Sequence, residues 1–173
     1  MGGAIFISVF NVRVTLFDYV ESIGNYFLAD VTLDFERPYR LEEIKGYGYQ
    51  DPRVTHVEGW TFATSEILYP DGSTAENISI LAPPADSDLV FPLLEDGRWI
   101  QPGDKQKMAI SEGIYDYYPD LQIGDQIPLK FKGKEELWQV VGVFKFIGLE
   151  GVIGYAPYDY ISREQNLANR SFS

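Results

Sequence analysis

The sequence contains no cysteine and only one histidine, His56. The lack of cysteine excludes disulfides, thiolate metal sites and cysteine nucleophiles. It leaves both the cytoplasm and an extracytoplasmic space open, because a domain of 173 residues is large enough to be stable without disulfides. A Ser-His-Asp triad would have to use His56, but no Gly-x-Ser-x-Gly elbow supplies a nucleophile. We therefore predict that His56 is a surface or hydrogen-bonded residue of a strand.

Positive charge is also scarce. Lysine and arginine number 14 against 26 aspartates and glutamates, which gives a net charge of −12. Phosphate backbones and anionic lipid headgroups repel a protein of this charge, and no basic run offsets the repulsion. The composition therefore argues against nucleic-acid binding and against electrostatic docking to a membrane.

The sequence has no long apolar run. Its longest N-terminal one, Ala4–Val14, is far shorter than the ~20 residues that a membrane-spanning helix needs. It lacks the basic region and the small-residue cleavage site of a signal peptide. Two interpretations remain: the start of a buried helix, or the outer end of a first membrane-spanning helix that is cut where this sequence starts.

Apolar and aromatic residues are abundant. The sequence is 45% hydrophobic and 15% aromatic, with 12 tyrosines and 11 phenylalanines, which favours a β-rich globular domain. We predict an α+β fold, in which a few helices pack on a mixed or antiparallel sheet and a β-rich hairpin subdomain is added. Residues 1–173 form one domain, with possible subdomains 1–50 with 147–173 and 51–146, because Gly46–Arg53 is rich in helix and strand breakers.

Hydrophobic periodicity and breaker residues predict the elements before residue 93. We expect a helix over Leu16–Leu28, a strand over Asp30–Glu36, and a short helix after Pro38 that buries Leu41 and Ile44 and ends at Gly46. We then expect one or two strands over Val54–Tyr69, a reverse turn at Pro70–Ser73, a return strand at Thr74–Ala82, and a short helix through Val90 capped by Asp86 or Ser87.

The stretch from Leu93 to Phe146 has the clearest pattern. We expect a tight turn at Gly97–Trp99, a strand at Lys107–Ile110, a short helix opened by Ser111 and a turn at Gly124–Asp125. A hairpin follows, with Ile127, Leu129 and Phe131 on one face of its first strand. Because Pro128 has no N–H, this strand either lies at a sheet edge or starts at Pro128. A charged loop at Lys132–Glu136 and an interior strand at Leu137–Phe146 complete the hairpin. A strand within Gly148–Tyr155 and a helix over Tyr158–Leu167, begun by Pro157, complete the prediction.

Four short motifs of this stretch occur in a distinctive order: Gly97-Arg98-Trp99, Met108-Ala109-Ile110-Ser111-Glu112, Leu121-Gln122-Ile123-Gly124-Asp125 and Gln139-Val140-Val141-Gly142-Val143. In order and spacing they resemble the extracytoplasmic, MacB-like periplasmic core domain of FtsX-like ABC transporter permeases. The resemblance covers most of Ala4–Gln165, and the further βα segment usual in that family is missing.

The resemblance implies a non-enzymatic domain on the extracytoplasmic side of the cell membrane, between the first and second spanning helices of a permease. It implies no catalytic, cofactor-binding or metal-binding residue. The expected partners are the permease's own transmembrane helices, an ABC ATPase subunit that hydrolyses ATP separately, and an extracytoplasmic protein or second permease copy. We name seven motif positions as fold-defining: Gly97, Arg98, Trp99, Gly124, Asp125, Val141 and Gly142.

Two alternatives come from other residues. Trp60, Trp99 and Trp138 are candidates for the stacking platform of a free-standing carbohydrate- or peptide-binding module, although their positions in strand or turn patterns favour core packing. Asp86-Ser87-Asp88 has the Asp-x-Asp form of a divalent-metal site in an enzyme, and also that of a helix cap. Glu112, Asp116 and Asp120 are candidates for paired catalytic carboxylates or for solvated charges.

Overall fold

The computed structural model describes residues 28–33, 35–37, 39–146, 151–167 and 170–171. They form a mixed sheet with two α-helices, which agrees with an α+β fold. The elements are β1 (Tyr39–Arg40), α2 (Leu41–Gly48), β2 (Thr61–Leu68), β3 (Thr74–Ala82), β4 (Leu93–Gly97), β5 (Lys107–Ser111), the 3₁₀ helix η1 (Glu112–Asp116), β6 (Gln126–Phe131), β7 (Lys134–Lys145), β8 (Val152–Tyr155), α3 (Tyr158–Glu164) and β9 (Arg170–Ser171).

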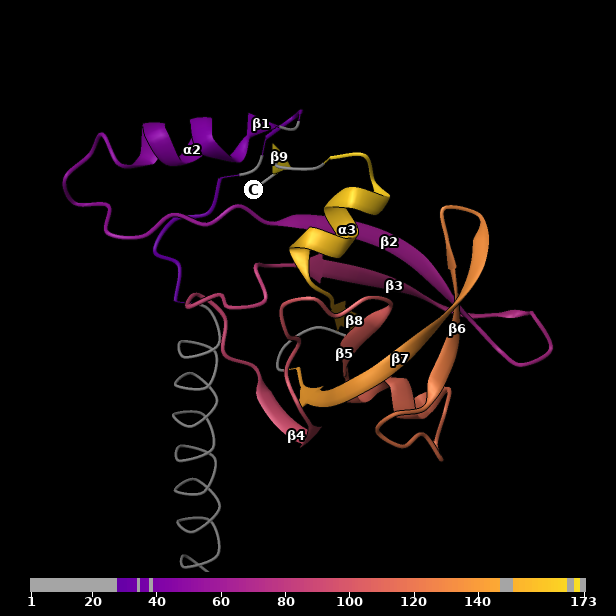
Figure 1. Cartoon of the computed structure of the whole chain (residues 1–173). Coiled ribbons are helices and arrows are strands. Elements are labelled where there is room, and N and C mark those ends of the chain that lie inside the picture. The colour runs from indigo at the N-terminus through magenta and orange to yellow at the C-terminus, as the bar shows by residue number, and fades with distance from the viewer. Residues whose placement is uncertain (1–27, 34, 38, 147–150, 168–169, 172–173) are drawn as a thin grey trace, which may run out of the picture.

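Six strands close into a ring. The order β7-β5-β8-β3-β2-β6 returns to its start because β6 also pairs with β7. Strand β4 lies outside the ring, on the same edge of β7 as β6 but farther along it, at residues 142–145 (Figure 1). The pairs β3–β8 and β5–β7 are parallel, and the other pairs of the ring are antiparallel. Each strand of the ring has a partner on both sides, although β2 meets β6 only over residues 65–67 and β5 meets β8 only over residues 109–110. Such closure reduces the strand edge that is open to edge-to-edge association.

The apolar residues form two clusters on opposite faces of the same strands. Met108 and Ile110 of β5 belong to the larger cluster, together with Trp138 and Val140, and all four are fully buried. Ala109, whose side chain points to the other face of β5, joins Phe144 and Tyr155 in a smaller cluster. Within β7, residues 140–144 are buried on both faces and Leu137 is exposed. Because β7 also has neighbouring strands on both sides, the prediction of an interior strand is confirmed for this part.

The first hairpin of the ring, β2–β3, is as predicted. The Tyr69 N–H donates to Ser73 O at 2.8 Å, and Gly72 takes the positive φ of 83° that the turn requires. Strand β3 has the expected bounds, with Ile78, Ile80 and Ala82 buried. Strand β2 begins only at Thr61, so residues 54–60 are not part of a strand.

The second hairpin, β6–β7, differs from its prediction in two respects. Its loop is only Lys132 and Gly133, with φ values of 49° and 77°, since β7 already begins at Lys134. Positive φ at both central residues gives the tight type I′ turn that matches strand twist. Strand β6 buries Ile127, Leu129 and Phe131 as expected, but it is not an edge strand, because β2 pairs with residues 129–131, just past Pro128.

The predictions before β2 are largely wrong or untested. Residues 30–33 and 35–36 form no strand, and Val31 and Leu33 are 74% and 62% exposed, so no strand among the described residues covers them. Helix α2 starts at Leu41 and runs to Gly48 without a fully buried residue. The predicted run Ala4–Val14, the helix Leu16–Leu28 before its last residue, and Gly148 lie outside the described residues.

Three further segments depart from the prediction. No helix follows Pro84, because the Ser87 hydroxyl oxygen accepts a hydrogen bond from the Leu89 N–H, at 3.1 Å, within a turn. Helix α3 ends at Glu164 rather than Leu167. The next residue, Gln165, donates through its side-chain amide to Phe62 O at 2.8 Å, which ties the helix end to β2. The short pair β1–β9 was not predicted at all.

Candidate functional site

Two glycines let β4 and β7 approach closely. Gly97, at the end of β4, lies opposite Gly142 of β7. A Cβ atom added at Gly142 would lie 2.2 Å from Arg98 O, and one added at Gly97 would lie 2.4 Å from Val141 O. Gly97 also has a φ of 76°, which other residues rarely adopt. The Arg98 N–H then donates to Val141 O at 2.8 Å, so the two backbones are hydrogen-bonded directly beside the two glycines.

The turn that contains Gly124 and Asp125 is hydrogen-bonded to the same part of β7. The Gly124 N–H donates to Val140 O at 2.8 Å, and the Val140 N–H donates to Asp125 O at 2.9 Å. The Asp125 carboxylate accepts from the Gln122 N–H at 2.9 Å, which closes the turn. The structure thus brings together the motif residues Gly97, Arg98, Gly124, Asp125, Val141 and Gly142, from three separate parts of the sequence. We call this assembly the glycine corner.

Arg98 anchors the glycine corner to the loop before β5. Its guanidinium donates to the Asp104 carboxylate in bidentate fashion, at 2.8 and 3.0 Å, and to Trp99 O at 2.8 Å. Asp104 is buried, and it also accepts from the Gln101 N–H at 2.9 Å and pairs with Lys107 at 3.5 Å. Burial raises the pKa of Asp104, but Arg98, Gln101 and Lys107 together outweigh burial and hold this pKa below its ordinary value.

A surface hollow of about 340 Å³ opens at the glycine corner. It is lined by Gly97, Arg98, Lys107, Ile123, Gly124, Gln139, Val140 and Val141. The ionisable residues of this lining are Arg98 and Lys107, and both pair with Asp104. The lining therefore offers no acid–base pair for catalysis, and the arrangement suits a rigid joint between strands.

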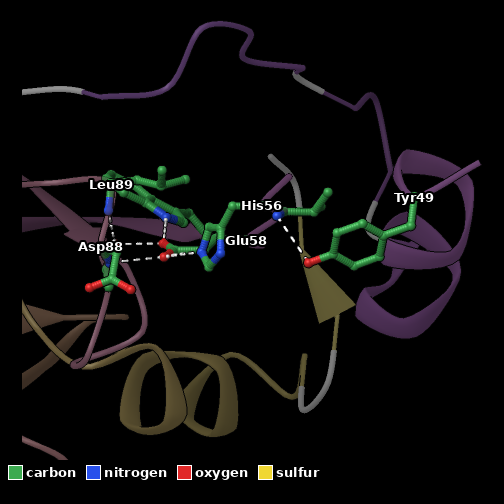
Figure 2. Close-up of polar contacts among 8 residues, drawn as sticks. Tyr49, His56, Glu58, Asp88 and Leu89 are labelled. Carbon is green, nitrogen blue, oxygen red and sulfur yellow. Dashed lines mark hydrogen bonds and ion pairs between the residues drawn. The ribbon is translucent and has the colours of Figure 1, made fainter. Parts of the chain in front are cut away.

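A second network is centred on Glu58, in the segment between α2 and β2. Its buried carboxylate accepts hydrogen bonds from Ser87 Oγ at 2.5 Å, His56 Nε2 at 2.9 Å, Trp60 Nε1 at 3.0 Å and the Asp88 N–H at 3.1 Å (Figure 2). Burial raises the pKa of Glu58, but these four donors together outweigh it and lower this pKa from its ordinary value. Glu58 thus ties segment 54–60 to loop 83–92.

The same segment holds the end of α2. Tyr49, directly after α2, accepts a hydrogen bond on its hydroxyl from the Val57 N–H at 3.3 Å (Figure 2). A Cβ atom added at Gly48 would lie 2.7 Å from Val57 Cγ2, so helix and segment are in close contact. Segment 54–60 therefore connects α2 to the ring through side chains as well as through the backbone.

The tryptophans and His56, which suggested a sugar-binding module and a catalytic triad, form neither kind of site in the structure. Trp138 is fully buried, and Trp99 packs on Tyr155 and Phe144 with ring centroids 5.0 and 6.4 Å apart. Because Trp138 is inaccessible, the three tryptophans cannot form a sugar-stacking platform. His56 lies in the irregular segment 54–60 rather than in a strand, and its contact is with Glu58.

The carboxylate candidates do not converge. Asp86 and Asp88 are exposed, and within the described ranges no group of three or more histidine, aspartate or glutamate side chains could hold a metal ion. Asp116 and Asp120 are exposed as well. The residues with the most developed polar surroundings, Glu58 and Asp104, were missed by sequence reasoning. A signal that could have pointed to Asp104 is the adjacent Pro102–Gly103 pair, which is typical of a turn.

The part of the chain that the structure describes contains no helix long and apolar enough to span a membrane. No protein-family model and no curated protein matches the sequence.

Solved structures do match the fold. One is the extracellular domain of the noncanonical ABC-type transporter YknZ from Gram-positive bacteria, with a TM-score of 0.58 and 19% identity over 77% of this chain and 69% of that one. Another is the periplasmic region of MacB from Actinobacillus actinomycetemcomitans, with a TM-score of 0.57 and 14% identity over 79% of this chain and 64% of that one. The chain thus has the fold of these extracytoplasmic domains, and it spans less than two thirds of the MacB region.

Proposed function

We propose that this chain is an extracytoplasmic domain of an ABC transporter permease of the FtsX/MacB type, held at the outer side of the cell membrane by transmembrane helices of the same permease. The observation that carries the proposal is the similarity of fold to the YknZ and MacB domains over more than three quarters of the chain. The order of the four motifs in the sequence supports it independently.

The arrangement of the chain ends is also compatible with this proposal. Strand β1, near the start of the described chain, pairs with β9, near its end, with Arg40 opposite Arg170. A domain inserted between two spanning helices needs its two ends close together, as is common where one domain is inserted into another.

In the proposed role the domain passes on motion and carries out no chemistry of its own. ATP is hydrolysed on a separate ATPase subunit, and the resulting movement of the spanning helices reaches a substrate, an extracytoplasmic protein or a second permease copy through this domain. The closed ring and the glycine corner support this role, because a stiff body transmits displacement with little internal loss.

The compartment can be tested with cysteine labelling, since the chain has no cysteine of its own. A Lys105→Cys variant of the full-length gene product, with any cysteines elsewhere replaced by serine, places a thiol at an exposed site. We expect a membrane-impermeant maleimide to label this thiol in cells whose cell wall or outer membrane has been removed and whose cell membrane is intact. Ala109 is fully buried, so an Ala109→Cys variant should be labelled only after denaturation. Labelling of the Lys105→Cys variant only after lysis would contradict the proposal.

Coupling needs a separate measurement on the reconstituted permease with its ATPase. Replacing residues 28–171 by a short flexible linker should leave basal ATP hydrolysis in place and abolish transport. Because basal hydrolysis reports that the membrane part is intact, its loss would point to misfolding rather than to coupling. Continued transport without the domain would show that the domain does not transmit the motion.

A further inference from the structure

A surface hollow of about 400 Å³ lies between the β2–β3 hairpin and the segment after η1. Its lining residues are Tyr69, Pro70, Tyr117, Tyr118, Pro119, Asp120, Leu121, Asp125, Gln126 and Ile127. The volume lies within the range of about 300–1,000 Å³ typical of ligand sites. We call it the tyrosine–proline hollow. It is distinct from the hollow at the glycine corner and shares no lining residue with it.

The aromatic walls of the tyrosine–proline hollow are fixed in place. The Tyr118 hydroxyl donates to Leu68 O at the end of β2, and the Tyr117 hydroxyl donates to the Glu76 carboxylate of β3 at 2.7 Å. The rings of Tyr69 and Tyr118 lie with centroids 6.4 Å apart. Side chains that are held before a ligand arrives lose little entropy on binding, so this surface is pre-organised.

The charge of the tyrosine–proline hollow has one sign. Apart from its tyrosines, its ionisable lining residues are Asp120 and Asp125, both exposed, and no lysine or arginine lines it. Tyrosine faces also attract cations through their quadrupole. A ligand for this hollow is therefore basic. An uncharged sugar is disfavoured, since two of the three tyrosine hydroxyls already donate their protons within the protein.

We propose that the tyrosine–proline hollow binds an extended, proline-containing basic segment of a partner protein. Flat apolar surfaces built from tyrosine and proline accept the rings of a polyproline II segment, which needs little ordering before it binds. Asp120 and Asp125 then receive an arginine or lysine of the same segment through charge-assisted hydrogen bonds. This inference stands whether or not the chain belongs to a transporter.

Fluorescence anisotropy with defined peptides tests the proposal on the whole chain. The probe is a dye-labelled peptide of about a dozen residues that alternates proline and arginine, which favours the polyproline II conformation. One matched peptide has glutamate in place of arginine, and another has glycine in place of proline. We expect saturable binding of the proline–arginine peptide, binding about tenfold weaker for the glycine–arginine peptide, and none for the proline–glutamate peptide.

Variants locate the binding. Tyr69→Ala and Asp120→Lys should each weaken binding of the proline–arginine peptide by about tenfold. The matched controls, Tyr47→Ala on α2 and Asp159→Lys on α3, change exposed residues outside the hollow and should leave binding within about twofold. Asp120 is exposed, so its variant remains informative if Tyr69→Ala fails to fold.

The proposal is overturned if the proline–arginine peptide shows no saturable binding. It is also overturned if the control variants lose as much affinity as the hollow variants, or if the glycine–arginine peptide binds equally well. In those two cases the peptide would only be neutralising an acidic surface, as a chain of net charge −12 allows.

Discussion

The contact between Gly97 and Gly142 makes a quantitative prediction for a series of four glycine-to-alanine variants. A Cβ atom at Gly142 would lie 2.2 Å from Arg98 O, whereas such atoms prefer to lie about 3.5 Å apart. The β4 end would have to move away by ~1 Å, which strains the hydrogen bond from the Arg98 N–H to Val141 O. Overpacking costs about 1–3 kcal/mol and a lost hydrogen bond about 1 kcal/mol. We therefore expect Gly142→Ala to lower the free energy of unfolding by about 3 kcal/mol.

The other three variants separate the causes. Gly46, inside α2, has open space around it and ordinary φ, so Gly46→Ala should be neutral or stabilising by up to about 1 kcal/mol. Gly72 has open space but a φ of 83°, so Gly72→Ala should cost only the backbone strain of about 1–2 kcal/mol. Gly97 combines a φ of 76° with a contact of 2.4 Å, and Gly97→Ala should be the most damaging, at about 3–5 kcal/mol.

Urea denaturation, followed by tryptophan fluorescence, measures the four free energies of unfolding, and thermal melts give an independent ranking. For a domain of this size each kcal/mol shifts Tm by roughly 2–4 °C, so Gly142→Ala should melt roughly 6–12 °C below the parent chain. The reasoning fails if Gly142→Ala is no less stable than Gly46→Ala. It fails equally if Gly97→Ala costs no more than Gly72→Ala, since the close approach would then contribute nothing.

Three further substitutions test the polar networks. Glu58→Gln should cost about 1–3 kcal/mol in urea denaturation at pH 7. The folded-state pKa of Glu58 is lowered, so its contribution to stability is full above the unfolded-state pKa of about 4.3 and is lost as pH falls through the folded-state pKa. The difference in the free energy of unfolding between the parent and Glu58→Gln should therefore shrink below pH ~4. Asp104→Ala leaves the partly exposed Arg98 guanidinium without its main partner and should lower the free energy of unfolding by about 2 kcal/mol. An unchanged urea midpoint would show that this ion pair contributes nothing to stability. Ser111→Ala removes the acceptor of the Ile153 N–H and should cost about 1–3 kcal/mol; faster amide exchange at Ile153 is the specific readout, and unchanged exchange would count against this bond.

Sequence reasoning succeeded where a local pattern is sufficient. The period-2 alternation of Ile78, Ile80 and Ala82 and the turn at Pro70–Ser73 define a hairpin without any knowledge of the remaining chain. The order of the four short motifs was also informative, and the comparison of folds agrees with it. The same reasoning failed for Asp30–Glu36, because alternation describes a strand only if another strand covers its apolar face.

Long-range contacts could not be predicted in this way. Nothing near Pro128 in the sequence shows that β2 pairs beside it, and the six-strand ring depends on that pairing. Likewise, Glu58 reaches Ser87, 29 positions along the chain, and neither residue carries a local signal for the other. Gly97 was predicted as a turn residue and Gly142 as part of an interior strand, and neither prediction indicated that the two glycines face each other.

The position of β8 in the ring has a consequence for the order of folding. β8 lies between β3 and β5, although it is synthesised after both of them and after β6 and β7. During synthesis, the facing edges of β3 and β5 therefore remain unpaired until Val152–Tyr155 has emerged, and the parallel pairing with β3 must close a long loop. During this interval a nascent chain would expose the unpaired backbone N–H and C=O groups of two strands with apolar faces, and binding by a chaperone would prevent misassociation.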